Sequence, residues 1–316
     1  MAVPASLLID DGAPVNLMCW HCTWETHVMA VPITMLRDFA DLCEGHGVCG
    51  KFSVPPMPAA LGRIDRQLNM VRPAHLRRFL DTVRRRITPR FDITCELLTH
   101  LVAYNITGDY FEHVYEDTWV SRATAEQIAD YIALAIRILD NVGLHSNGVT
   151  SPWSTGAGNE LAYARGIAEA FWRTHRQKMS WYFLHCLAGH QAAWPWVAWK
   201  DRRRGLITAS VPANTPDVFW HAQYARSLRA ARASARAGVD ALLSRDGRTG
   251  AVRRLVDSHL PVTLLTHWQS LFANGRFAGL WGLQMLLKRM AKHLAGDILW
   301  MKCSELAQHA RQKRPP

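Results

Sequence analysis

The chain has 316 residues, of which 49% are apolar and 20% are charged, a composition typical of a globular protein with a sizeable core. No apolar run is long enough to span a membrane and no basic segment precedes an apolar one near the N-terminus, so we expect a cytoplasmic protein without a membrane partner. The formal net charge of +11 comes without a recognised nucleic-acid-binding motif. We therefore interpret the arginine clusters as solvated helix faces and do not expect a nucleic-acid partner.

The first notable segment is LLIDDGAPVN, residues 7–16. Its apolar run predicts a short buried strand that ends at Asp10 and Asp11, followed by a turn. Adjacent carboxylates repel each other unless a cation or a shared proton offsets the repulsion. Two interpretations remain open, because one carboxylate can cap the turn while the other is solvated, or the pair can belong to a site.

The seven cysteines are expected to be reduced, because the chain shows no export signal. Cys19 and Cys22 have the spacing of a redox dithiol, but they follow the turn after Asp11 instead of lying within a small βαβ unit. One such pair also supplies only two of the four ligands that a structural zinc needs. The pair is therefore left without an assigned role.

Helix-like and strand-like segments alternate along the chain. Amphipathic spacing predicts helices at 34–46, 73–87, 123–142, 159–176, 222–243 and 279–295. Thr34 is a candidate N-cap of the first helix. Thr124 is the expected cap of the third, 123–142, which Gly143 ends. Strands are predicted at 7–9, 48–54, 91–100, near 148–151 and at 260–268.

This alternation indicates an α/β protein built from parallel βα units. With no internal repeat, linker or domain boundary, residues 1–316 are expected to form a single domain. Chemically capable residues follow the predicted strands: Asp10 and Asp11, then His100, the segment TSPW at 150–153, and His267. If the sheet closes into a barrel, catalytic groups belong at these carboxyl ends.

These segments resemble the motifs of the polysaccharide deacetylases. LLIDDGAP is similar to the opening motif, FDITCELLTH (91–100) to the second, and IADYIALAIRILDNVGLHSNGVTSPW (128–153) to the helix and aromatic–proline loop of the third. LVDSHLPVTLLTHW (255–268) resembles the final histidine motif, and ILWMKCSELAQ (298–308) the closing strand and helix. The resemblance covers most of the chain, in the family's order.

The resemblance implies a distorted (β/α) barrel that holds a divalent metal, usually zinc. Carried over by position, Asp10 would be the general base, Asp11 and His100 metal ligands, and His267 the acid that protonates the leaving group. Such a site hydrolyses an N- or O-acetyl group from a carbohydrate or sugar-like small molecule.

Three features depart from the family's pattern, one of which is that the glycine flanking the third motif is displaced. Tyr104 stands where a second histidine ligand is usual, and neither it nor Asn105 is a usual zinc ligand. Thr150 stands where an arginine normally supports the base. Replacement ligands suggested by residue type are His21, His113 and His221, and the sequence does not choose among them.

Substrate contacts are expected from aromatic and polar residues near the motifs. Among thirteen tryptophans, Trp153 and Trp268 directly follow motif positions, and Trp220 and the segment WPWVAW (194–199) are further candidates. Any of them can equally be a core residue. Asn105 and Glu160 complete the expected substrate-binding set, although Glu160 also suits the first turn of a helix.

Asp217 and His221 lie four residues apart and would share a helix face. Pro216 fits a helix start, so we expect Asp217 to cap that start instead of forming a metal pair.

Two other functions remain open. One is a glycoside hydrolase that uses Glu160 or Glu96 as a partner carboxylate. The other is a catalytically silent barrel that binds carbohydrate through its tryptophans. The substrate and the oligomeric state are not determined by the sequence, and a homo-oligomer is compatible with it.

Overall fold

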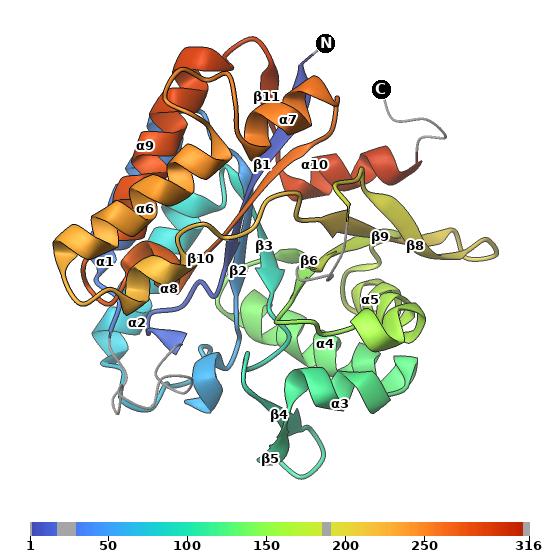
Figure 1. Cartoon of the computed structure of the whole chain (residues 1–316). Helices are drawn as coiled ribbons and strands as arrows, with labels where there is room; N and C mark the ends of the chain where they lie inside the picture. Colours follow the sequence, from blue (N-terminus) through green and yellow to red (C-terminus); the bar gives the residue numbers. More distant parts are fainter. Residues whose placement is uncertain (1, 18–29, 185–190, 312–316) are drawn as a thin grey trace.

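The computed structural model describes residues 2–17, 30–184 and 191–311, and a mostly parallel sheet forms its centre (Figure 1). Its strands run in the order β10-β1-β2-β3-β6-β7-β9-β8, with β11 paired to β1, and only β8 is antiparallel to its neighbour. Their bounds are β1 Val3–Asp10, β2 Gly50–Val54, β3 Phe91–Cys95, β6 Ser146–Ser151, β7 Met179–Leu184, β8 Trp196–Asp201, β9 Leu206–Pro212, β10 Val262–His267 and β11 Ile298–Trp300. A separate hairpin joins β4 Val102–Asn105 and β5 Tyr110–Tyr115.

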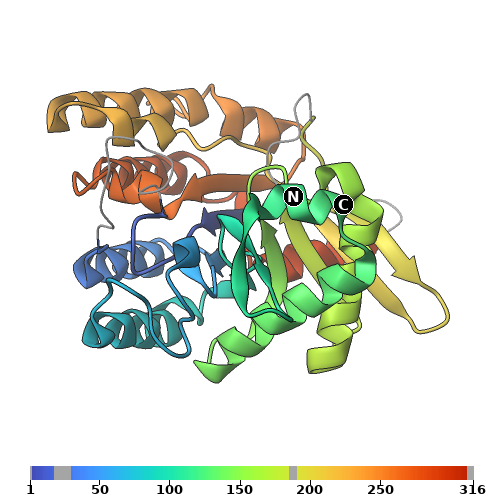
Figure 2. The ribbon, with the colours of Figure 1, turned by 90° about the horizontal axis from the view of Figure 1, so that it is seen from below.

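The helices flank the two halves of this sheet (Figures 1 and 2). On one side lie the neighbouring pairs α1–α2 and α6–α9 together with α8, while α4 and α5 pack together beside β6 to β9. Their bounds are α1 Ile33–Gly45, α2 Pro73–Thr82, α3 Glu116–Arg122, α4 Ala125–Asn141, α5 Glu160–His175, α6 Leu228–Leu242, α7 Ala251–Asp257, α8 Trp268–Phe272, α9 Ala278–His293 and α10 Cys303–Gln308. Within the described ranges, no helix has the length and apolarity needed to cross a membrane.

The sheet is open in the part of the chain that the structure describes. Strands β10 and β8 end the ladder at its two edges, and no strand pairing joins them there. The observed architecture is thus an α/β fold with a mostly parallel sheet, as the alternation of elements predicts.

Side-chain alternation along β1 separates two cores and positions the first carboxylate. Leu7 and Ile9 belong to the large core that includes residues of the flanking helices, whereas Leu8 belongs to a smaller one with Phe183 of β7 and Leu306 of α10. Because residues two apart share a strand face, Asp10 lies on the same face as Leu8. The C-terminal helix α10 thus covers this inner face, and Asp10 lies on it at the carboxyl end of β1.

Most predicted elements are confirmed, with shifted ends. Helix α4 begins with the predicted capping box, in which Thr124 and Gln127 bond reciprocally. Thr34 is not an N-cap, because α1 already begins at Ile33 after Pro32. The predicted helix 73–87 is α2 followed by one π-helical turn, Val83–Ile87.

Candidate metal and catalytic centre

The turn after β1 brings both aspartates toward one end of the sheet. Asp11 adopts a left-handed backbone conformation with φ of 63°, and its amide donates to Ser53 Oγ at 3.0 Å and to Glu96 Oε2 at 2.8 Å. Gly12 is required there, because a Cβ atom would lie 2.3 Å from the Ser53 carbonyl oxygen. The motif's glycine thus permits the close approach of this turn to β2.

A buried lysine offsets the repulsion between the two aspartates. Lys51 of β2 has no exposed surface, and its ammonium group forms an ion pair with Asp10 Oδ1. The same group donates to Thr150 Oγ1 at 2.7 Å and lies 4.5 Å from the centre of the Phe183 ring. Lys51 therefore supplies a cation beside Thr150, the position at which the resemblance leads one to expect an arginine. Nothing in the sequence indicated this role, because a lysine inside a strand usually marks a solvated face.

Asp11, Glu96 and His100 form a compact buried cluster. His100 Nε2 lies 3.0 Å from Asp11 Oδ1 and 3.8 Å from Glu96 Oε1, and one ligand atom from each residue lies within 4.8 Å of the others. Glu96 Oε1 has no hydrogen-bond donor among the described residues. The side chain amide of Gln269 donates to the other oxygen of Asp11.

Burial dominates the proton equilibria of this cluster. Desolvation raises the pKa of Asp11, and desolvation together with the charge of Asp11 raises the pKa of Glu96 to about 8. Desolvation also lowers the pKa of His100, so its neutral form is favoured. Without a cation the site resists holding two carboxylate charges, and a bound cation would relieve that cost.

A second buried carboxylate fixes the loop that carries His100. Glu116, at the start of α3, accepts backbone N–H bonds from Leu98, Thr99 and His100 at 3.0, 2.9 and 2.8 Å. The hydroxyl of Tyr131 donates to the same carboxylate at 2.7 Å. His100 has φ of 55°, a conformation that persists only where the surroundings enforce it.

His267 lies at the end of β10, directly beside Asp10 in the parallel register. Its Nδ1 is 2.8 Å from Asp217 Oδ2, which also accepts from Ser270 Oγ at 2.6 Å. Burial lowers the pKa of His267, but the hydrogen bond to Asp217 and the charge of Asp11 outweigh it and raise the pKa to about 9. The hydrogen bond to Asp217 and the neighbouring carboxylates therefore favour the imidazolium form of His267.

Asp217 was expected as a helix cap, but the short helix Trp220–Tyr224 begins after Phe219 without a side-chain cap. One role of Asp217 is instead in the preceding turn, where its Oδ1 accepts from the backbone N–H of Phe219 at 2.8 Å. The second role, as partner of His267 from 50 residues away, leaves no local signal in the sequence.

Two tryptophans lie against the histidines. The Trp153 ring centre is 4.8 Å from that of His100, and the Trp220 ring centre is 4.9 Å from that of His267. Both indoles are half-buried. Trp268 is instead 1% exposed and packs edge-on against Phe39 and Phe52, as a core residue does.

The two other expected substrate-binding residues, Asn105 and Glu160, have local partners elsewhere. Asn105 bonds Glu112 within the β4–β5 hairpin, and the neighbouring Tyr104 hydroxyl bonds Asp109. Glu160 is in the first turn of α5 and accepts from the Tyr182 hydroxyl.

Of the three histidines suggested as replacement ligands, the two that the structure describes do not join the cluster. His113 and His221 are both exposed, on β5 and on the short turn Trp220–Tyr224 respectively. His21 lies outside the described residues, as do Cys19 and Cys22. Among the residues of known position, Glu96 is the third ligand candidate.

The donor set of the cluster fits a divalent metal. One imidazole nitrogen with two carboxylate oxygens is a combination that zinc accepts, and three protein ligands leave a position for water or substrate. The buried, unbonded Glu96 Oε1 is the observation that supports this fit. The fold and the site together define a class of α/β protein with an acidic–histidine centre at the carboxyl ends of parallel strands.

Comparisons with known proteins agree with this architecture. A crystal structure from Mycobacterium smegmatis, of a protein provisionally assigned as a polysaccharide deacetylase, superposes with a TM-score of 0.54 over 98% of this chain and 91% of that chain, at 12% identity. A 4-alpha-glucanotransferase from Thermococcus litoralis gives a TM-score of 0.44 at 12% identity, over 98% of this chain and 40% of that one. No family model and no curated protein sequence matches the chain. The first likeness shows a common fold.

Proposed function

We propose that this protein is a metal-dependent hydrolase that removes an acyl group from a carbohydrate or sugar-like small molecule, on an open and distorted version of the deacetylase (β/α) barrel. The observation that carries the proposal is the buried cluster of Asp11, Glu96 and His100 beside Asp10 and His267. The structural likeness to the Mycobacterium smegmatis protein supports it at the level of the fold.

The three cluster residues would hold the metal. When bound, a divalent ion at this place polarises an acyl carbonyl and acidifies water. In this proposal Glu96 is the third metal ligand, in place of the histidine that the family has at the position of Tyr104. The Tyr104 hydroxyl is bonded to Asp109 in the hairpin.

The proton transfers fall to the residues around the cluster. Asp10 accepts a proton from the attacking water, and the adjacent Lys51 ammonium favours the ionised carboxylate that this step needs. The imidazolium of His267 donates a proton to the leaving amine or alcohol. Asp217 stabilises the imidazolium and fixes its ring through Nδ1.

Trp153 and Trp220 supply the substrate surface in this proposal. Each half-buried indole lies beside one of the two histidines, so a sugar ring between them would contact flat apolar faces while its acyl group reaches the centre.

The test compares Glu96→Gln with Tyr104→Phe. Both variants are purified without a metal-binding tag, incubated with Zn²⁺ and analysed for bound metal, and acetate release from N-acetylated and O-acetylated amino sugars is measured. We expect wild type and Tyr104→Phe to retain about one tightly held ion and activity, and Glu96→Gln to lose both while its circular dichroism remains that of the folded chain. Metal bound equally by Glu96→Gln would refute the ligand assignment.

Substrate assays separate the remaining functions. Metal binding with sugar binding but no acetate release, unaffected by Asp10→Asn, would identify a silent binding protein instead of a hydrolase. Cleavage of glycosidic bonds without acetate release would identify a glycoside hydrolase.

A further inference from the structure

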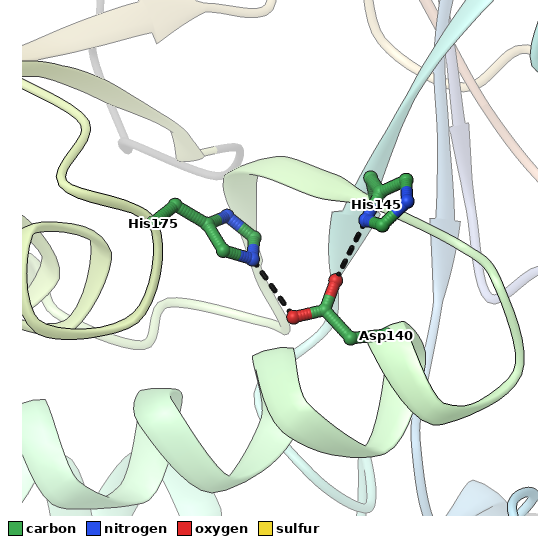
Figure 3. Close-up of side chains that lie close together, drawn as sticks. All are labelled: Asp140, His145 and His175. Carbon is green, nitrogen blue, oxygen red and sulfur yellow. Dashed lines mark hydrogen bonds and ion pairs between the residues drawn. The ribbon is translucent and has the colours of Figure 1, made fainter.

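A second set of metal-binding side chains lies at the other end of β6 from the proposed active site. Asp140 is near the end of α4, His175 ends α5, and His145 directly precedes β6 (Figure 3). Thr150, which accepts a hydrogen bond from Lys51, is five residues further along the same strand, about 16 Å away at 3.3 Å per residue. This second set is therefore separate from the buried centre.

The three side chains converge on one point. His145 Nδ1 lies 2.9 Å from Asp140 Oδ1, and His175 Nε2 lies 2.8 Å from Asp140 Oδ2 (Figure 3). One ligand atom from each residue lies within 4.8 Å of the other two. Two imidazoles and one carboxylate are ligands that zinc and neighbouring divalent transition metals prefer.

The local electrostatics favour a cation. Helices α4 and α5 pack together and both end at this place, so the negative ends of both helix dipoles lie beside the cluster. Two nearby arginines are engaged elsewhere: Arg84 pairs with Asp81, and Arg176 lies over the Trp172 ring at 5.4 Å. Asp140 adds a carboxylate between the two imidazoles.

The cluster is open to solvent on one side. The His145 side chain is 82% exposed, whereas those of Asp140 and His175 are 28% and 24% exposed. An ion can therefore enter without rearrangement of the core, and water can complete its coordination.

We propose that Asp140, His145 and His175 form a divalent transition-metal site of the zinc type, independent of the hydrolytic centre. The ion ties the ends of α4 and α5 to the start of β6, three segments that the Asp140 carboxylate already joins by hydrogen bonds. With only three protein ligands the site exchanges its ion with solvent, so its stabilisation of the fold grows with the logarithm of the free metal concentration once that concentration exceeds the Kd.

The test uses the full chain carrying Glu96→Gln, which removes a proposed ligand of the buried centre. Titration of the metal-free protein with ZnCl₂ by calorimetry is expected to give one site. Adding His145→Ala or His175→Ala is expected to weaken that binding at least about tenfold, because each removes a ligand. The matched control is His113→Ala, which removes another exposed histidine and leaves zinc binding unchanged.

The outcomes separate the two proposals. Because His145 is largely exposed, His145→Ala is expected to fold normally, which circular dichroism checks. The surface site is overturned if the His145 and His175 variants bind zinc as tightly as the Glu96→Gln protein from which they are made. It is also overturned if the Glu96→Gln protein binds no zinc. If wild type and Glu96→Gln bind zinc identically and His145→Ala weakens that binding, the buried centre fails and the surface site stands.

Discussion

At the scale of single residues, the buried lysine of β2, Lys51, is expected to contribute to stability through its ion pair with Asp10. Both side chains are at most 1% exposed, so removing one partner leaves an uncompensated buried charge. We expect Lys51→Met to lower the free energy of unfolding by about 3–5 kcal/mol. The double variant Asp10→Asn/Lys51→Met is expected to recover much of that loss, since neither charge then remains.

Urea unfolding of the wild type, both single variants and the double variant measures this coupling. Additive losses in the double variant would mean that the pair contributes no interaction free energy and that Lys51 acts through packing against Phe183 alone.

At the scale of elements, the β3–β4 loop depends on Glu116. Its carboxylate accepts three consecutive backbone N–H bonds and holds His100 in a left-handed conformation. Glu116→Gln replaces one acceptor oxygen by a donor that faces these N–H groups or the Tyr131 hydroxyl. We expect a loss of about 1–3 kcal/mol of unfolding free energy, together with weaker zinc binding at the buried centre.

Tyr131→Phe is the matched comparison, because it removes one hydroxyl donor and leaves all three backbone bonds. It is expected to affect zinc binding less than Glu116→Gln. Equal zinc affinity in wild type and Glu116→Gln would show that His100 keeps its position without this carboxylate.

The sequence predicts those elements whose signal is local. The capping box of α4, the strand β1 and the aspartates after it are readable because spacing and turn chemistry lie within a few residues. Strands β7, β8 and β9 were not predicted, and Trp196–Trp199 proved to be in the edge strand β8. Lys51 contacts Asp10, Glu96 contacts Asp11 and Asp217 contacts His267 across 41 to 85 residues of the chain, and spacing alone does not reveal such contacts.

At the scale of the whole molecule, folding raises the pKa values of several buried groups, among them Glu96 to about 8, Glu116 to about 7 and His267 to about 9. A raised pKa in the folded state means that folding binds protons more tightly than the unfolded chain does. The corresponding stability is complete below the unfolded values of about 4.5 for Glu and 6.5 for His and is lost as pH rises through the folded values. All three groups act in the same direction.

We therefore expect the metal-free protein to lose several kcal/mol of unfolding free energy between pH 6 and pH 9, since each pKa unit corresponds to about 1.4 kcal/mol. Urea unfolding at several pH values in the presence of a chelator measures this loss. Glu96→Gln removes one titrating group and should flatten the curve, whereas Glu44→Gln, at an exposed position, should leave its shape unchanged. Saturating Zn²⁺ should also flatten it in the wild type, because a cation beside Glu96 stabilises its ionised form. A stability that rises over this range would mean that these carboxyl groups are ionised in the folded protein without any metal.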